Sequence, residues 1–101
     1  MGAYLGQKLL ELAERFPEIG DMRQVGLHIG LELVDDPKRQ KPLEAEAAAI
    51  RMAGFKHGLI LGMGGVRRNV LKVKPPLIVN QDECDEIIAK LEAAMRQVLR
   101  K

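Results

Sequence analysis

The chain has 101 residues, enough for one small domain with a single modest hydrophobic core. Hydrophobic residues make up 47% and charged residues 30%, a balance typical of a folded globular protein. The net charge is only +2 and aromatic residues make up 3%, which argues against a nucleic-acid-binding surface with stacking rings. A single cysteine, Cys84, excludes an internal disulfide and favours a reduced, cytoplasmic setting. No run approaches the roughly 18 apolar residues of a membrane helix, and no secretory signal pattern is present.

The N-terminal segment has the pattern of an amphipathic helix followed by a strand. From Leu5 to Phe16 apolar residues recur at spacings of four, three and four, and Pro17 ends this helix because the residue before proline avoids the helical region. Residues 19–21 are interpreted as a turn. From residue 22 to residue 34 the period changes to two, which predicts one long strand with one strongly apolar face.

The middle of the chain predicts a loop and a second helix. Gly26 and Gly30 interrupt the polar face of the long strand, and we expect a helix or another backbone to lie close over them. Residues 35–41 form a charged loop. Pro42 fits the first turn of a helix, where its missing N–H costs nothing, and Gly58 fits the left-handed position just after the helix ends.

The next segment predicts two short strands around a glycine-rich loop. Residues 59–61 form a continuous apolar run, interpreted as a strand buried on both faces. Residues 62–68 are rich in glycine and end in two arginines, which predicts a basic loop. Residues 69–74 alternate again and form a strand that ends at the proline pair 75–76, with a short extended run at residues 77–79.

The C-terminal segment predicts the longest helix. Asn80 and Glu83 stand in the spacing of a capping box, acidic residues crowd the start, and basic residues crowd the end. Its apolar stripe places Cys84 in the core as a small hydrophobic residue rather than as a reactive thiol. The predicted order is helix, strand, helix, strand, strand, helix. This order predicts an α+β two-layer sandwich, with helices on one face of a small, mainly antiparallel sheet.

The basic residues around the glycine-rich loop are the first candidates for ligand binding. The loop lacks the sequence of a phosphate-binding loop and leads into a strand, which also excludes a dinucleotide fingerprint. Its backbone amides could still hold an anion with the help of Arg67 or Arg68, although a turn with solvated arginines is the simpler interpretation. Lys72 and Lys74 share one face of the following strand and could bind a carboxylate beside a cleft.

The other polar candidates favour structural roles. His28 has no second metal ligand at a plausible spacing and is interpreted as a packing residue. His57 is expected at a helix C-terminus, where the dipole favours a solvated imidazole. Asp35 and Asp36 are interpreted as loop residues rather than as a carboxylate pair. No nucleophile–base pair emerges, so the residues alone indicate a small α+β domain with an anion-binding edge.

Two stretches resemble the C-terminal small domain of class III pyridoxal-phosphate-dependent aminotransferases. The first is residues 16–34, FPEIGDMRQVGLHIGLELV, and the second runs from GLILG at residues 58–62 to NVLKVKPPL at residues 69–77. The resemblance covers essentially the whole chain and is strongest to the alanine–glyoxylate aminotransferase-like branch. It implies that residues 1–101 form one domain, an excised C-terminal piece of a longer enzyme. The glycines at 26, 30, 62 and 65 match family positions and are interpreted as structural.

The resemblance also implies a chemistry that the residues alone do not show. Enzymes of this family move an amino group between an amino acid or amine and an oxo acid, with pyridoxal 5′-phosphate bound as a Schiff base to a lysine of the large domain. This chain would carry no catalytic and no cofactor-binding residue, would be inactive alone, and would depend on the missing large domain, in an enzyme that is usually a homodimer. A family arginine that grips the substrate carboxylate corresponds to Lys72, which keeps the charge but loses the planar fork.

Three other functions stay open at this stage. The chain could be a stand-alone anion-binding or regulatory module, in which the anion is bound by Arg67, Arg68, Lys72 and Lys74. It could belong to a phospho-lyase of the same family, which would eliminate phosphate instead of transferring nitrogen. A nucleic-acid binder is the least favoured, because the net charge is small and stacking aromatics are few. If a large domain is missing, we also expect an exposed apolar patch where it would pack.

Overall fold

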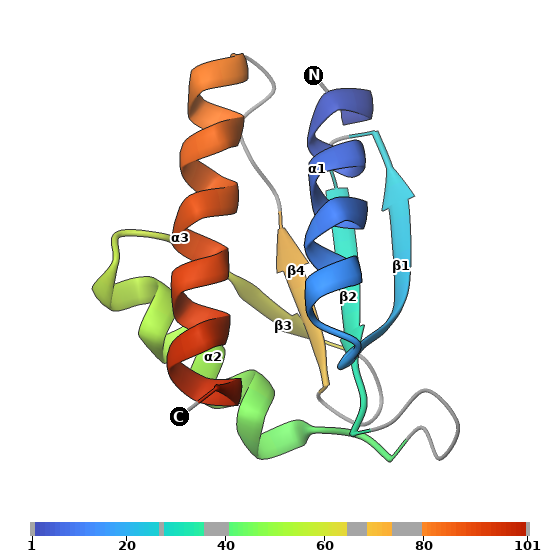
Figure 1. The fold of residues 1–101 in the computed structure, drawn as a ribbon, viewed down its shortest axis with the longest axis vertical. Coiled ribbons are helices and arrows are strands. Elements are labelled where there is room, and N and C mark those ends of the chain that lie inside the picture. The colour runs from blue at the N-terminus through green and yellow to red at the C-terminus, as the bar shows by residue number, and fades with distance from the viewer. Residues whose placement is uncertain (1, 27, 36–40, 65–68, 74–79, 101) are drawn as a thin grey trace.

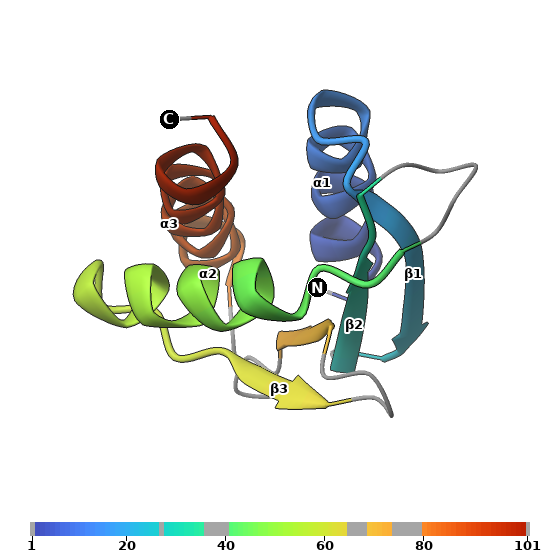
Figure 2. The ribbon, with the colours of Figure 1, turned by 90° about the horizontal axis from the view of Figure 1, so that it is seen from below.

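The computed structural model describes residues 2–26, 28–35, 41–64, 69–73 and 80–100. Figure 1 shows their helices and strands, and Figure 2 shows the helices gathered on one side of the sheet. The predicted α+β class, with helices on one face of an antiparallel sheet, is confirmed. The order along the chain is α1 (Gly2–Arg15), β1 (Ile19–Val25), β2 (His28–Leu33), α2 (Glu44–Lys56), β3 (Gly62–Gly64), β4 (Val70–Val73) and α3 (Gln81–Leu99).

The sheet has the strand order β1-β2-β4-β3, and every neighbouring pair is antiparallel. Its inner face meets the helices in one hydrophobic core. The α1 stripe, with Leu5, Leu9, Leu12 and the following Phe16, is buried as predicted. Burial of each such side chain contributes about 1.5–3 kcal/mol, so this stripe fixes α1 on the sheet.

The predicted strand over residues 22–34 is instead a hairpin, and the predicted turn at residues 19–21 lies in a strand. β1 begins at Ile19 and pairs with β2 through a register that ends at Val25 opposite His28. The chain reverses at Gly26, whose φ of +59° is a left-handed conformation that glycine adopts at little cost. The turn could not be recognised from the sequence, because the alternation of apolar and polar residues continues from one strand of the hairpin into the other.

The second helix begins slightly later than predicted. Pro42 forms an isolated antiparallel bridge with Val34, and α2 starts at Glu44. Glu44 and Glu46 lie in the first turn, where their charges complement the helix dipole. Gly58 follows the helix with a φ of +83°, which confirms its predicted capping role.

The third strand begins at Gly62, directly after the segment 59–61 that was predicted to form it. Residues 59–61 form no strand, and although Leu59 and Leu61 are buried, Ile60 is 81% exposed, so the segment is not buried on both faces. Gly62–Gly64, which were predicted to be loop, form β3 at the edge of the sheet. The apolar run marked burial correctly at its two ends, but pairing with β4 determines where the strand lies.

The last strand and helix follow the sequence closely. Leu71 and Val73 of β4 are buried, as the alternation predicts. The capping box at the start of α3 is complete: the Glu83 amide donates to Asn80 Oδ1 at 2.9 Å, and the Asn80 amide donates to Glu83 Oε1 at 3.1 Å. Cys84 is fully buried in the core, and burial raises the pKa of its thiol.

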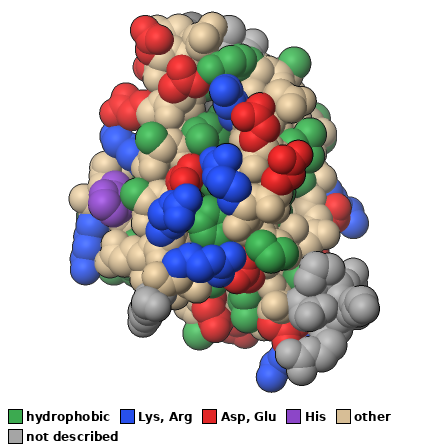
Figure 3. Space-filling view, in the orientation of Figure 1, with side chains coloured by type: hydrophobic (Ala, Val, Ile, Leu, Met, Phe, Trp, Pro, Cys, Tyr) green, Lys and Arg blue, Asp and Glu red, His purple; other side chains and the backbone are tan. Residues whose placement is uncertain are grey.

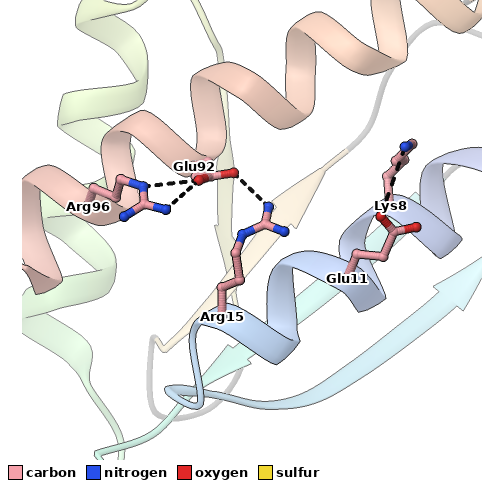
Figure 4. Close-up of polar contacts among 5 residues, drawn as sticks. All are labelled: Lys8, Glu11, Arg15, Glu92 and Arg96. Carbon is pink, nitrogen blue, oxygen red and sulfur yellow. Dashed lines mark hydrogen bonds and ion pairs between the residues drawn. The ribbon is translucent and has the colours of Figure 1, made fainter.

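Ion pairs join α3 to the N-terminal part of the chain. Glu92 accepts from Arg15 of α1 at 2.7 Å and from Arg96 of its own helix at 2.8 Å (Figure 4). Near the end of α3, Arg100 donates to both carboxylate oxygens of Glu18, at 2.6 and 3.0 Å. Acidic and basic side chains are interspersed over this helical face (Figure 3), so it presents no large field of one sign.

Candidate functional site

The outer face of the sheet, opposite the helices, carries the polar residues that the sequence singles out. Residues directly opposite each other in an antiparallel pair project to the same face. The register places Gly30 of β2 between Arg23 of β1 and Lys72 of β4. Along β2, His28 and Glu32 flank Gly30 on the same face. A bare glycine therefore lies at the centre of four polar side chains.

Two adjoining hollows cover this part of the sheet. The first, about 190 Å³ and called here the His28–Lys72 hollow, is lined by His28, Ile29, Gly30, Val70 and Lys72. The second, about 260 Å³, shares Gly30 and Val70 with it and is bordered by residues of β1 and β2: Asp21, Arg23 and Glu32. The first hollow thus carries a histidine and a lysine, and the second carries one arginine and two carboxylates.

Lys72 is half-buried, and β3 accommodates its side chain. It lies opposite Gly62 across the β3–β4 pair as well as opposite Gly30. A methyl group built on Gly64 would collide with Cε and Nζ of Lys72, so the end of the lysine lies over that glycine. Because Gly62 and Gly64 have no side chains, the stem and ammonium of Lys72 fit over β3 at the sheet edge. The sequence analysis did not predict this role for the two glycines. The alternation of glycine with Met63 was the available signal.

The structure separates the remaining candidates. His28 is exposed on the outer face, so the prediction that it is a packing residue is wrong. His57 is exposed at the C-cap of α2, as predicted. Asp35 lies in a bend and accepts a hydrogen bond from the Lys41 amide at 3.1 Å, which agrees with a loop role. The structure does not describe the other predicted loop and strand-end residues: Asp36, Gly65, Arg67, Arg68, Lys74, Pro75, Pro76 and residues 77–79.

Metal binding finds no support in the described residues. Among them, no three histidine, cysteine, aspartate or glutamate side chains gather in a way that could hold a metal ion. The helices of the same residues include none that is long and apolar enough to cross a membrane.

An apolar surface lies apart from these hollows, beside α2. Met52 and Phe55 of that helix and the following Ile60 are 55%, 66% and 81% exposed. With Arg51 and Leu61 they line a hollow of about 400 Å³. Large apolar side chains exposed together are unusual on an isolated small domain, and they fit the expectation of an uncovered patch.

Comparison with known proteins defines the class to which this domain belongs. The pattern of the aminotransferase class-III family matches residues 1–95. Over 97% of its length the chain superposes on a Bacillus anthracis aminotransferase with a TM-score of 0.89 at 33% identity, but it covers 23% of that protein. The four-stranded sheet with its helices is thus a domain of the kind found in these aminotransferases.

Sequence relatives give the same result. The chain is 38% identical over 98 residues to isoleucine 2-epimerase from Lentilactobacillus buchneri. It is 36% identical over 98 residues to the mitochondrial alanine–glyoxylate aminotransferase 2 homolog 2 from Arabidopsis thaliana. These matches cover 96% and 97% of this chain but only 21% and 20% of the two relatives. The chain belongs to the class III aminotransferase family and spans about a fifth of the length of these relatives.

The described residues do not fit pyridoxal phosphate, the cofactor of this family. Among the described residues, Lys72 and the exposed His28 are the polar side chains that line the His28–Lys72 hollow. No carboxylate of the described part of the chain borders this hollow to face a pyridinium nitrogen, although Glu32 borders the adjoining one. A Schiff-base site needs a lysine and a carboxylate around a water-excluding pocket, and these described residues do not form one.

Proposed function

We propose that the chain, as a single domain over residues 1–101, is the C-terminal small domain of a pyridoxal-phosphate-dependent transaminase. In the whole enzyme it would help to form the substrate pocket, while the large domain would supply the Schiff-base lysine. The observation that supports this is the family match over residues 1–95, together with a close structural likeness that covers less than a quarter of the related enzyme. The isolated chain is then inactive, and amino acids and oxo acids are substrates of the whole enzyme.

Replacement of the matching segment of the Bacillus anthracis aminotransferase by this chain tests the proposal. The recipient lacking that segment is the baseline, and transfer of an amino group from an amine or amino acid to an oxo acid is the measured activity. We expect the chimera to exceed the baseline and the isolated chain to show no turnover with added cofactor. Turnover by the isolated chain, or a soluble and folded chimera with no gain over the baseline, would contradict the proposal.

Within that enzyme we propose that Lys72 binds the substrate carboxylate. Its position on the open face and its long stem let the ammonium reach a ligand beside the sheet. In an active chimera, Lys72→Ala should raise KM for the amino donor, and Lys72→Arg should lower it, because arginine restores two parallel hydrogen bonds. Lys8→Ala, which removes a surface cation of α1, is the matched control. An unchanged KM in Lys72→Ala removes Lys72 from the substrate site.

A second candidate function is racemisation or epimerisation of an amino acid. It is favoured by the similarity to isoleucine 2-epimerase, whose identity to this chain is as high as that of the transaminase relatives. The two functions differ in stoichiometry, because transamination consumes an oxo acid and epimerisation needs none. The chimera should therefore be supplied with one enantiomer of an amino acid, with and without an oxo acid, and its products separated by chirality.

A further inference from the structure

The His28–Lys72 hollow is a small depression bordered by one histidine and one lysine. Gly30 forms its floor and contributes no side chain, while β4 brings Lys72 directly opposite that glycine. His28 stands two residues from Gly30 on the same face of β2. The hollow of about 190 Å³ therefore has two nitrogen-bearing side chains at its border and apolar walls from Val70.

We propose that His28 and Lys72 together bind one carboxylate group over Gly30. This deepens, and rests on, the proposed role of Lys72, and makes His28 a second carboxylate-binding residue. An ammonium is a single point of charge and cannot grip both carboxylate oxygens as a guanidinium does. An imidazole N–H can donate to the second oxygen, whether the ring is neutral or protonated.

The neighbouring charges set where the carboxylate lies. Arg23 is held by Asp21 at 3.1 Å, so its charge is already partly used. Glu32 flanks Gly30 on the side away from His28 and repels an anion from that end of the depression. The bound carboxylate therefore lies toward His28. Because the end of Lys72 rests over Gly64, binding requires its flexible stem to turn toward Gly30.

The two histidines of the chain provide an internal test. Sodium acetate is titrated into the 101-residue chain at constant ionic strength while the imidazole C2–H resonances of His28 and His57 are followed by NMR. We expect a saturable shift at His28 and none at His57, which lies exposed at the end of α2. Acetamide, the neutral isostere of acetate, should produce no such shift.

Substitutions then assign the contacts. Lys72→Ala should weaken the acetate response of His28 about tenfold, which corresponds to about 1.4 kcal/mol. His28→Asn, followed through the Gly30 amide, should weaken it similarly, whereas Lys8→Ala should leave it unchanged. A full amide spectrum verifies that each variant is folded, and Lys72→Gln replaces Lys72→Ala if that variant is not.

Three results would overturn the proposal: equal responses at both histidines, an equal response to acetamide, or an unchanged midpoint in Lys72→Ala. The first two would mean that acetate binds adventitiously or not at all, and the third that Lys72 takes no part in binding it. These results are independent of the chimera, because acetate binding needs no turnover. An active chimera together with no acetate response at His28 leaves the transaminase assignment intact and removes this site. A soluble, folded but inactive chimera together with an acetate response at His28 removes the assignment and leaves the site intact.

Discussion

Substitutions of Gly30 test separately how this residue affects the stability of the domain and how it affects acetate binding in the His28–Lys72 hollow. Among the described residues, a Cβ built on Gly30 would meet Val70 Cγ1 alone, at 3.3 Å, so alanine requires a shift of a few tenths of an ångström. Replacing glycine by alanine where the backbone permits it stabilises by about 0.4–1 kcal/mol through the unfolded chain. After the cost of the close contact we expect a net gain of about 0.5 kcal/mol, or roughly 2–4 °C in Tm for a domain of this size.

The matched control is Gly26→Ala, which has the opposite geometry. No atom of the described residues lies within 4 Å of a Cβ at Gly26, yet its φ of +59° strains an L-residue. It should therefore lose about 1–2 kcal/mol without any steric clash. Urea unfolding of both variants measures the two free energies from the shift in midpoint at constant slope.

The same position then tests ligand binding. Gly30→Val should keep the domain folded, because a branched residue suits a strand, but it would fill the floor of the His28–Lys72 hollow and abolish the acetate response of His28. A loss of more than about 1 kcal/mol in Gly30→Ala would refute the reasoning. It would mean that another element packs closely over Gly30, as the sequence suggested and as the structure does not show.

Other perturbations test the frame that carries the site. Asn80→Ala should lower the free energy of unfolding by about 1 kcal/mol, because it removes the cap of α3, whereas Asn80→Ser should keep it. Thermal unfolding measures both variants, and equal losses would exclude a capping role. Hydrogen bonds from Arg100 and Arg96 lower the pKa values of Glu18 and Glu92 below the ordinary 4.5. Both contributions are present above that pH and lost as pH falls through the lowered pKa values. Acid unfolding should therefore begin below about pH 4.5, and Glu18→Gln should flatten this dependence, whereas an unchanged acid profile would contradict it.

The helices were predictable because their signals are local. The apolar spacing up to Phe16, the cap at Asn80 and the glycine at 58 each act within a turn or two of the chain. The hairpin was not predictable, because one long strand and two strands joined by a tight turn show the same period-two alternation. Gly26 was the one local signal for reversal, and it was interpreted as a strand glycine.

β3 shows a second limit of local patterns. Its three residues have two glycines, which disfavour strands, and the apolar run just before it is the better strand candidate by composition. Only the partner determines the outcome: Gly62 and Gly64 pair with β4, and their bare faces leave room for the stem and ammonium of Lys72. The glycine-rich sequence was interpreted as a loop because the pairing that makes it a strand comes from β4, which lies elsewhere in the chain.

The site depends on the same non-local pairing. Alternation alone places Lys72 on the face of β4 away from the core, but His28 has no local reason to be a ligand. The strand order β1-β2-β4-β3 sets β2 beside β4 although α2 and β3 lie between them in the chain. That adjacency brings His28 to the border of the hollow that Lys72 lines, with Gly30 as the floor. The proposed carboxylate site at Lys72 calls for a second donor to the other oxygen, because an ammonium is a single point of charge, and this sheet order sets His28 beside it.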